Sequence, residues 1–199
     1  MAKSERMRER LRRAEAYPYE IPGRSFVQIG ERTVELDELP DLSGREPLLA
    51  YGSNAAPEAL VRKLAAEPRA PLPLLRAELA DFDAVYSDHI SPYGAVPATL
   101  HPSPGTVLAV FVAYPTAPQR LLLAASEPNY EARRLTAVSC RPELGDPLQE
   151  LDAFVSRHGC LRLDGSAVAL SAIPARNRRF PALDQTAAKR LRASRASSP

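Results

Sequence analysis

The sequence predicts an α+β fold, and three observations support this. Segments typical of strands outnumber segments typical of helices. The connections between them are too short for the regular helical crossovers of a doubly wound sheet. The segment Thr106 to Tyr114 (TVLAVFVAY) is rich in β-branched and aromatic residues and predicts a central strand. The chain has 199 residues, 45% of them hydrophobic and 25% charged, so it can bury a core without disulfides or metals.

The first 46 residues are predicted to form an N-terminal extension. Ser4 to Ala16 lacks Gly and Pro and spaces opposite charges as neighbours on a helix surface, which predicts a charged helix. After the YPYEIPG break, Ser25 to Leu36 predicts two short strands around Gly30 and Glu31, which could join a neighbouring sheet. The stretch Asp37 to Pro47 has loop composition and marks the expected boundary of the main domain.

The main domain is predicted to span residues 47–175 and to begin with a strand, a tight turn and a helix. Pro47 to Tyr51 is a short apolar run, and Gly52-Ser53-Asn54 has turn composition. Pro57 to Ala66 has helical composition, with Pro57 in a first-turn position.

The remaining elements follow from composition and turn residues. Further strands are expected at Leu74–Tyr86, Gly94–Leu100, Thr106–Tyr114 and Arg134–Ser139, a turn at Pro102–Gly105, a helix at Ala117–Ala125, and a hairpin around Asp164-Gly165 within Leu151–Ile173. Residues 176–199 are predicted to form a basic C-terminal helix and tail, with the helix from Pro181 to Ala193.

Basic side chains are concentrated at the two ends of the chain. Residues 1–13 contain six basic and two acidic side chains, and residues 176–199 contain seven basic and one acidic. Arg-rich ends are usually solvated, and these lack the interleaved aromatic residues that stack on bases, Phe180 being the sole candidate. We therefore do not expect nucleic acid to be a partner, and a tether to RNA or another polyanion is the minor alternative.

Targeting signals and a disulfide framework are missing from the sequence. No apolar stretch approaches the roughly 20 residues of a membrane span, and Met1 to Arg13 lacks the apolar run of a signal peptide. Two cysteines, Cys140 and Cys160, do not make a disulfide framework. We expect a cytoplasmic protein with reduced thiols and no membrane partner.

Strong cofactor and metal motifs are also missing. The sequence contains no GxxxxGK, GxGxxG, HExxH or paired CxxC motif. A zinc site would require scattered residues to meet in space, and no local ligand spacing indicates one (His89, His101, His158, Cys140, Cys160). Ser53 follows a glycine, as a hydrolase nucleophile would, but the second glycine of GxSxG is missing. We expect neither a metal nor an organic cofactor.

The turn Tyr51-Gly52-Ser53-Asn54 is the segment best suited to bind an anion. Backbone N–H groups in a turn that leads into a helix lack partners and have positive partial charge, which suits a carboxylate or a developing oxyanion. The same residues also make an ordinary turn, with Ser53 or Asn54 as a helix N-cap. The residues alone allow both interpretations.

Leu48 to Asn54 (LLAYGSN), followed by a predicted helix, resembles the opening motif of the gamma-glutamylcyclotransferase-like superfamily. The downstream order is similar to that family as well: Gly94 to Pro104 (GAVPATLHPSP), Gly105 to Tyr114 (GTVLAVFVAY), then Glu127 with Tyr130 in SEPNYEARRL. The resemblance covers roughly residues 48–135, under half of the chain. It implies a mixed, strongly curved or barrel-like β-sheet with flanking helices.

The resemblance also implies a cofactor-independent cyclotransferase, of acyltransferase or lyase type, acting on a γ-glutamyl or related amide. The substrate's α-amine attacks its own γ-carbonyl and releases 5-oxoproline and a free amine. Glu127 would be the general base and then the general acid. Residues 52–54 would supply backbone donors to the substrate's carboxylate or γ-carbonyl. Tyr51 would line the pocket, and Tyr130 would hydrogen-bond the substrate or orient Glu127.

Two further interpretations remain open. The fold could be a non-catalytic module that binds a small amino-acid-like or acyl ligand. Glu127 could also be a solvent-facing glutamate near a helix end. Turnover that depends on Glu127 separates both from the cyclotransferase.

Overall fold

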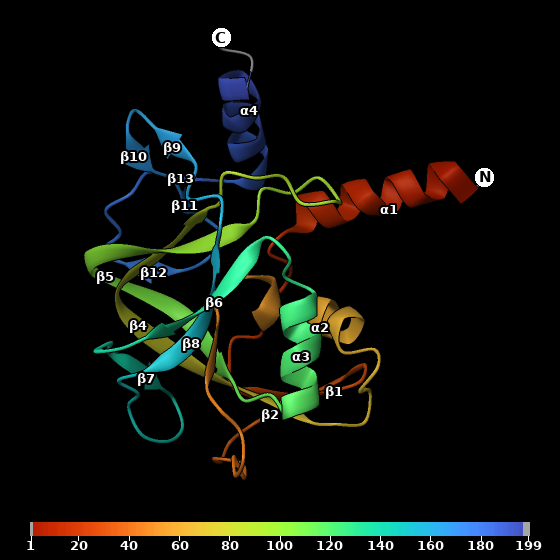
Figure 1. Ribbon diagram of the computed structural model, residues 1–199, viewed down its shortest axis with the longest axis vertical. Coiled ribbons are helices and arrows are strands. Elements are labelled where there is room, and N and C mark those ends of the chain that lie inside the picture. The colour runs from red at the N-terminus through yellow and green to blue at the C-terminus, as the bar shows by residue number, and fades with distance from the viewer. Residues whose placement is uncertain (1, 197–199) are drawn as a thin grey trace.

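A computed structural model describes residues 2–196 and shows the predicted α+β class (Figure 1). Residues 197–199 of the predicted C-terminal tail lie outside the described residues. The helices are α1 (Ala2–Ala16), the short 3₁₀ helix η1 (Ser53–Ala55), α2 (Pro57–Lys63), α3 (Ala117–Ala125) and α4 (Gln185–Ala196). The strands are β1 (Phe26–Ile29), β2 (Arg32–Glu35), β3 (Leu48–Ala50), β4 (Leu72–Tyr86), β5 (Ala98–Ala113), β6 (Tyr130–Leu135), β7 (Cys140–Pro142), β8 (Leu151–Ser156), β9 (Arg162–Leu163), β10 (Ser166–Ala167), β11 (Ala169–Leu170), β12 (Ala175–Arg176) and β13 (Ala182–Leu183).

The large sheet is mixed and is built around the long antiparallel pair β4 and β5. Its strand order is β13-β11-β4-β5-β3-β8-β6, with β1, β7 and β12 paired off this path. The pairs β3–β8 and β11–β13 are parallel, and the other pairs are antiparallel. The register of β4 against β5 shifts between Ala80 and Phe82, where Asp81 has φ +64°. Both strands bend in this region, so the sheet is curved (Figure 1).

The sheet does not close into a barrel, so the barrel-like alternative is wrong. Within residues 2–196, the strand order ends at β13 on one side and at β6 on the other, and these two strands are not paired. The edge strand β6 (YEARRL) exposes charged side chains at its centre, which disfavours pairing with a further strand. The opposite edge strand, β13, has only two residues.

Each face of the sheet buries its own hydrophobic cluster. In β3, Leu48 and Ala50 belong to one cluster and Leu49 belongs to the other, as the alternation of side chains along a strand requires. The helices α2 and α3 cover the first face through Leu60 and Leu123, both almost fully buried. This packing fixes the ends of β3, α2 and α3 close together, which decides where the candidate site forms.

Several predicted elements are confirmed, and others are wrong. Of the strands predicted at Arg134–Ser139 and Gly94–Leu100, only the last two residues of β6 and the first three of β5 are in a strand. The strands around Gly30 pair as β1 and β2, the helix Ala117–Ala125 is α3, and the hairpin around Asp164-Gly165 is β9–β10. The predicted turn at Pro102–Gly105 is instead part of β5. The last helix begins at Gln185, because Asp184 caps it by accepting a hydrogen bond from Ala187 N at 2.7 Å, and the preceding residues form β13.

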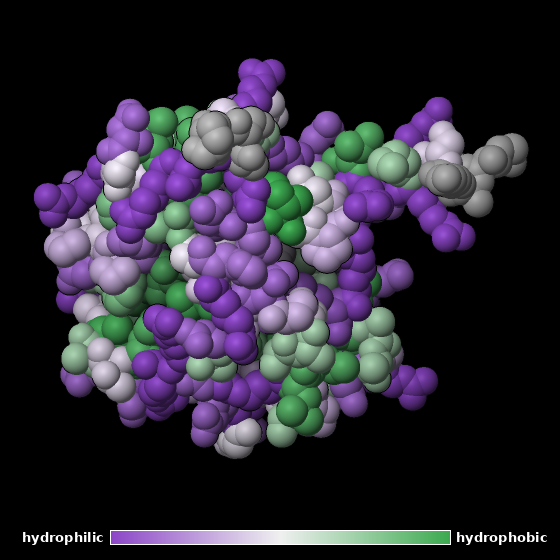
Figure 2. All heavy atoms as spheres, turned by 45° about the horizontal axis from the view of Figure 1, so that its top comes forward, coloured by the Kyte–Doolittle hydropathy of each residue, from purple (hydrophilic) through white to green (hydrophobic). Residues whose placement is uncertain are grey.

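The N-terminal extension joins the rest of the molecule from the end of α1 onward. Strand β1 pairs with β4, and Ala14, Tyr17 and Tyr19 are buried in the core. The first part of α1 projects from the body (Figure 1), and Figure 2 shows that hydrophilic side chains cover most of the face seen there. None of the helices described is both long and apolar enough to cross a membrane.

Candidate functional site

The turn between β3 and α2 is held by its own backbone and not by a side-chain cap. Ala55 N donates to Gly52 O at 2.9 Å and Ala56 N donates to Ser53 O at 3.2 Å, which closes η1. Gly52 and Ala56 occupy the N-cap positions of η1 and α2 without a side-chain cap bond, so the predicted N-cap role of Ser53 or Asn54 is wrong. The first N–H groups of η1 therefore have no partner within the turn.

The glycine of the motif is needed because the N-terminal extension packs onto it. A Cβ atom at Gly52 would lie 2.9 Å from the hydroxyl oxygen of Tyr17. That hydroxyl is fixed in place, because it accepts a hydrogen bond from Ala98 N at 2.8 Å and the side chain is buried. Any side chain at position 52 would displace Tyr17 from this position.

Glu127 points inward and contacts the turn. It follows α3, and its side chain is 14% exposed, so the interpretation of a solvent-facing glutamate is wrong. Asn54 Nδ2 donates to Glu127 Oε1 at 3.1 Å, and Lys63 Nζ donates to the same oxygen at 2.6 Å. The structure therefore brings the turn motif and the predicted acid into direct contact.

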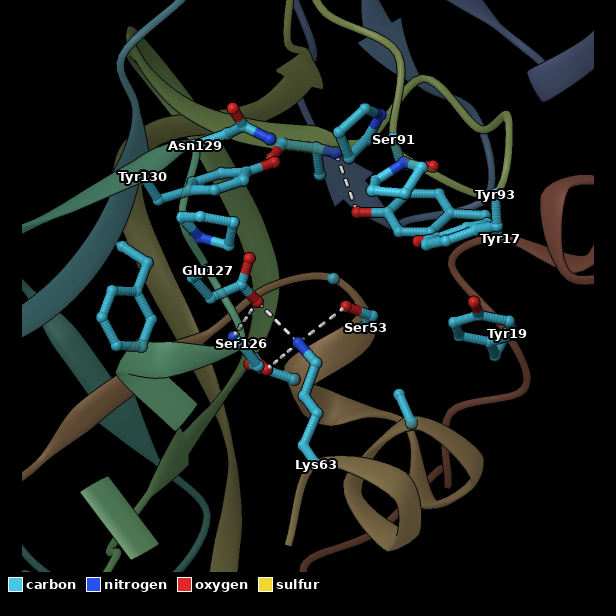
Figure 3. Close-up of a pocket in the computed structure, with 18 of the residues that line it drawn as sticks. Tyr17, Tyr19, Ser53, Lys63, Ser91, Tyr93, Ser126, Glu127, Asn129 and Tyr130 are labelled. Carbon is cyan, nitrogen blue, oxygen red and sulfur yellow. Dashed lines mark hydrogen bonds and ion pairs between the residues drawn. The ribbon is translucent and has the colours of Figure 1, made fainter. Parts of the chain in front are cut away.

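Lys63, the last residue of α2, connects the polar side chains of the site. Its Nζ donates to Asn54 Oδ1 at 2.7 Å and to Ser53 Oγ at 3.4 Å, in addition to Glu127. Both bonds to the carboxylate fall on Oε1, and Oε2 makes no hydrogen bond within residues 2–196. Figure 3 shows this second oxygen pointing into open space. A ligand can therefore reach one oxygen of a carboxylate that is held in place by hydrogen bonds to its other oxygen.

The open space is a cavity of about 680 Å³, within the range of roughly 300–1,000 Å³ that is usual for small-ligand sites. All six residues predicted for the site line it: Tyr51, Gly52, Ser53, Asn54, Glu127 and Tyr130. Further lining comes from the N-terminal extension and from the loop between β4 and β5, including Arg10, Arg13, Tyr17, Tyr19, His89 and Tyr93. The cavity thus collects segments from Arg10 in α1 to Phe154 in β8.

The buried tyrosines form rigid, neutral walls. The hydroxyl of Tyr51 donates to Phe154 O, and the hydroxyl of Tyr130 donates to Ala98 O at 2.8 Å. Burial raises the pKa of both phenols, and also that of Tyr17, well above the ordinary range. Because its hydroxyl bonds to the backbone, Tyr130 does not hydrogen-bond Glu127.

His89 lines the cavity as a neutral imidazole. Its Nδ1 lies 2.7 Å from Ser87 Oγ. Its ring packs edge-on against Tyr130, with 5.7 Å between centroids, and lies tilted by 34° against His158, with 4.7 Å between centroids. Burial, and then the nearby His158, lower the pKa of His89 to about 4. At neutral pH His89 therefore adds no charge to the cavity.

The low pKa of His89 predicts a pH-dependent stability. The unfolded chain protonates His89 below about pH 6.5 and the folded chain only below about pH 4, so stability is lost as the pH falls between these values. We expect His89→Gln to reduce the slope of the unfolding free energy against pH in this window. The reduction corresponds to at most about one bound proton. Urea unfolding from pH 7 to pH 4 measures it, with His101→Gln as the control. Equal slopes for wild type and His89→Gln would contradict the assignment.

Sequence reasoning missed three kinds of residue at the site. Lys63 was assigned only to a helix, although its position nine residues after Asn54 allows it to reach back to the turn. Tyr17 and Tyr19 were assigned to a break, and Arg13 to a solvated helix. The clustering of two tyrosines in YPYEIPG was the available signal, because large aromatic residues in a break often anchor it to a core.

Comparisons with known proteins give no family assignment. No protein-family model matches the chain, and no curated protein matches it. Among the described residues, no three His, Cys, Asp or Glu side chains are grouped to hold a metal ion. The chemistry that the site can perform therefore follows from Glu127, Lys63, the turn and the cavity.

Proposed function

We propose that this protein is a cofactor-independent cyclotransferase of the gamma-glutamylcyclotransferase-like kind, which cleaves a γ-glutamyl or related amide. The observation that supports this most is the hydrogen bond from Asn54 Nδ2 to Glu127 Oε1, which joins the turn motif to a carboxylate 73 residues away. Both features were singled out by the resemblance, and they meet in one cavity of ligand size.

Substrate binding uses two parts of the site, the start of η1 and the carboxylate of Glu127. The unpartnered N–H groups at the start of η1 attract the α-carboxylate or the γ-carbonyl oxygen of the substrate. The α-ammonium group of the substrate contacts Oε2 of Glu127, the carboxylate oxygen that Lys63 and Asn54 leave open. These two contacts would hold the amine against its own γ-carbonyl, and this positioning accelerates ring closure.

Proton transfer then completes the reaction. Glu127 accepts a proton from the α-ammonium group, and the freed amine attacks the γ-carbonyl carbon to form a five-membered ring. The amide C–N bond breaks as Glu127 passes the proton to the leaving nitrogen. The ring nitrogen loses a second proton to the departing amine, which leaves as an ammonium ion. No water is consumed, and 5-oxoproline is the other product.

Lys63 acts as a positioning residue in this scheme. Its ammonium group holds Oε1 at 2.6 Å and keeps Oε2 directed to the cavity. The side chain is 16% exposed, so solvent screens this pair only partly. Tyr51 and Tyr130 bound the cavity, and their hydroxyls are already bonded to backbone carbonyl groups.

Product analysis tests the proposal. Purified protein is incubated with γ-L-glutamyl-L-alanine, a γ-glutamyl amine and glutathione, and products are identified by mass spectrometry. We expect 5-oxoproline and the free amine in equal amounts from at least one of them. Two compounds serve as matched controls: α-L-glutamyl-L-alanine lacks the γ-amide, and N-acetyl-γ-L-glutamyl-L-alanine lacks the attacking amine. Neither should give the two products.

Two results would contradict the proposal. Release of free glutamate would indicate hydrolysis by water and not cyclisation. Saturable binding of a γ-glutamyl compound without any product would support the non-catalytic binding module.

A further inference from the structure

The wall of the cavity that faces Glu127 is formed by the N-terminal extension and the loop between β4 and β5. Figure 3 shows Tyr17, Tyr19 and Tyr93 across the open space from Glu127 and Lys63. Arg10 and Arg13, from the last turns of α1, also line the cavity. This wall therefore combines aromatic rings with guanidinium groups.

The cavity has an excess of positive charge that the protein does not neutralise. Among the described lining residues Glu127 is the one carboxylate, and Lys63 pairs with it. Arg62 pairs with Glu58 at 2.9 Å. On α1, the carboxylate of Glu9 is bonded by Arg12 at 2.9 Å. Arg13 lines the cavity and forms no ion pair within residues 2–196, and Glu9, a carboxylate whose pKa it helps to lower, is already bonded by Arg12.

Arg13 is held in place with its donors unused. Its guanidinium carbon lies 4.6 Å from the ring centroid of Tyr93. The N–H groups of a stacked guanidinium lie in the plane of the guanidinium group, where two of them can bind an oxyanion. The Nε atom is buried and has no hydrogen-bond partner among the described residues. The two Nη atoms are not enclosed in this way and also make no hydrogen bond within residues 2–196, so they are the donors that a ligand in the cavity can reach.

We infer that Arg13 is a specificity-determining residue that binds an oxyanion on the leaving amine of the substrate. Glu127 and the turn hold the γ-glutamyl end, and Arg13, assisted by Arg10, binds a carboxylate or phosphate at the far end. The substrate class is then a γ-glutamyl amide whose leaving amine has an acidic group, as an amino acid has. Amides of neutral amines or polyamines are outside this class. This inference rests on the proposed function for the identity of the γ-glutamyl end.

A pair of ligands that differ in one charge tests the role of Arg13. γ-L-Glutamyl-L-alanine and γ-L-glutamyl-L-alaninamide are titrated by calorimetry into Glu127→Gln protein, so that turnover does not consume them. We expect the acid to bind about tenfold or more tightly than the amide. In Glu127→Gln/Arg13→Gln the ratio should fall to about one, and Arg13→Lys should restore part of it. Arg8→Gln is the matched control, because Arg8 is an exposed arginine of α1 outside the cavity. γ-L-Glutamyl-phosphoethanolamine distinguishes a phosphate from a carboxylate as the bound oxyanion. Tighter binding of this compound than of γ-L-glutamyl-L-alanine assigns the site to phosphorylated amines.

Failure of this inference and failure of the proposed function give different results. Equal kcat/KM for acid and amide in wild type, both yielding 5-oxoproline, would support the cyclotransferase and overturn the role of Arg13. A preference for the acid that persists in Arg13→Gln would overturn it as well. Binding that prefers the acid and depends on Arg13, without 5-oxoproline formation, would support the anion site and contradict cyclisation.

Discussion

Glu127→Gln is expected to lower kcat for 5-oxoproline formation by about 10²–10⁴-fold, the usual contribution of a positioned general acid–base group. The amide has nearly the same shape as the carboxylate, and its carbonyl oxygen can still accept hydrogen bonds from Lys63 and Asn54. The substitution therefore removes the proton-carrying group and leaves the cavity in place. The measurement is the initial rate of product release at saturating substrate.

Two controls make this result specific to the carboxylate in the cavity. Glu46→Gln changes an exposed glutamate that does not line the cavity, and it should keep the wild-type rate. Thermal unfolding of Glu127→Gln, followed by circular dichroism, checks that the fold is intact. Turnover at the wild-type rate in Glu127→Gln would remove Glu127 from the mechanism.

Arg178→Met is expected to lower the free energy of unfolding by about 3–5 kcal/mol, the usual cost of leaving one charge of a buried pair without its partner. Asp83 is fully buried in β4, and Arg178 Nε and Nη2 each donate to its carboxylate at 2.9 Å. Arg178 also donates to Ile173 O at 2.8 Å. This pair ties the segment after β12 to the sheet, so its loss affects both.

Arg176→Met is the matched control for this prediction, because it lies two residues away and pairs with Glu78 on the same strand. The side chains of that pair are 64% and 48% exposed, so its loss should cost no more than about 1 kcal/mol. Urea unfolding followed by circular dichroism measures both variants. Asp83→Asn combined with Arg178→Met should recover part of the loss, since no unpaired charge remains. Equal stabilities for the two Met variants would contradict the importance of the buried pair.

The long strand β5 shows where sequence reasoning stops. The pattern Pro102-Ser103-Pro104-Gly105 is typical of a turn, yet these residues continue the strand. In the described structure only Pro102 of these four residues has a register partner, Phe82 of β4, while β3 and β12 pair farther along β5. An edge strand tolerates prolines, because it does not need every N–H group. Gly105 has φ +82° and donates its N–H to Asp81 at 2.7 Å, so the kink is stabilised by a contact between strands that no local pattern reveals.

Some residues of the candidate site could likewise be predicted from the sequence, and others could not. The segment around Gly52 and the acid Glu127 could be selected from the sequence, since turn composition and a family-like order mark them. Lys63 and Arg13 could not, because a basic residue on a helix is more often solvated than part of a site. Their positions depend on how α1 and α2 pack against the sheet, which is a property of the whole fold.

The backbone N–H and C=O groups of Ala98 link distant parts of the chain to one another. Its N–H donates to Tyr17 and its carbonyl accepts from Tyr130, so one residue of β5 connects the N-terminal extension to β6. The proposed catalytic carboxylate and the turn both lie after residue 47, but one wall of the cavity comes from before it. The first twenty residues therefore serve the molecule twice, because Tyr17 and Tyr19 belong to its core and also line the proposed binding site.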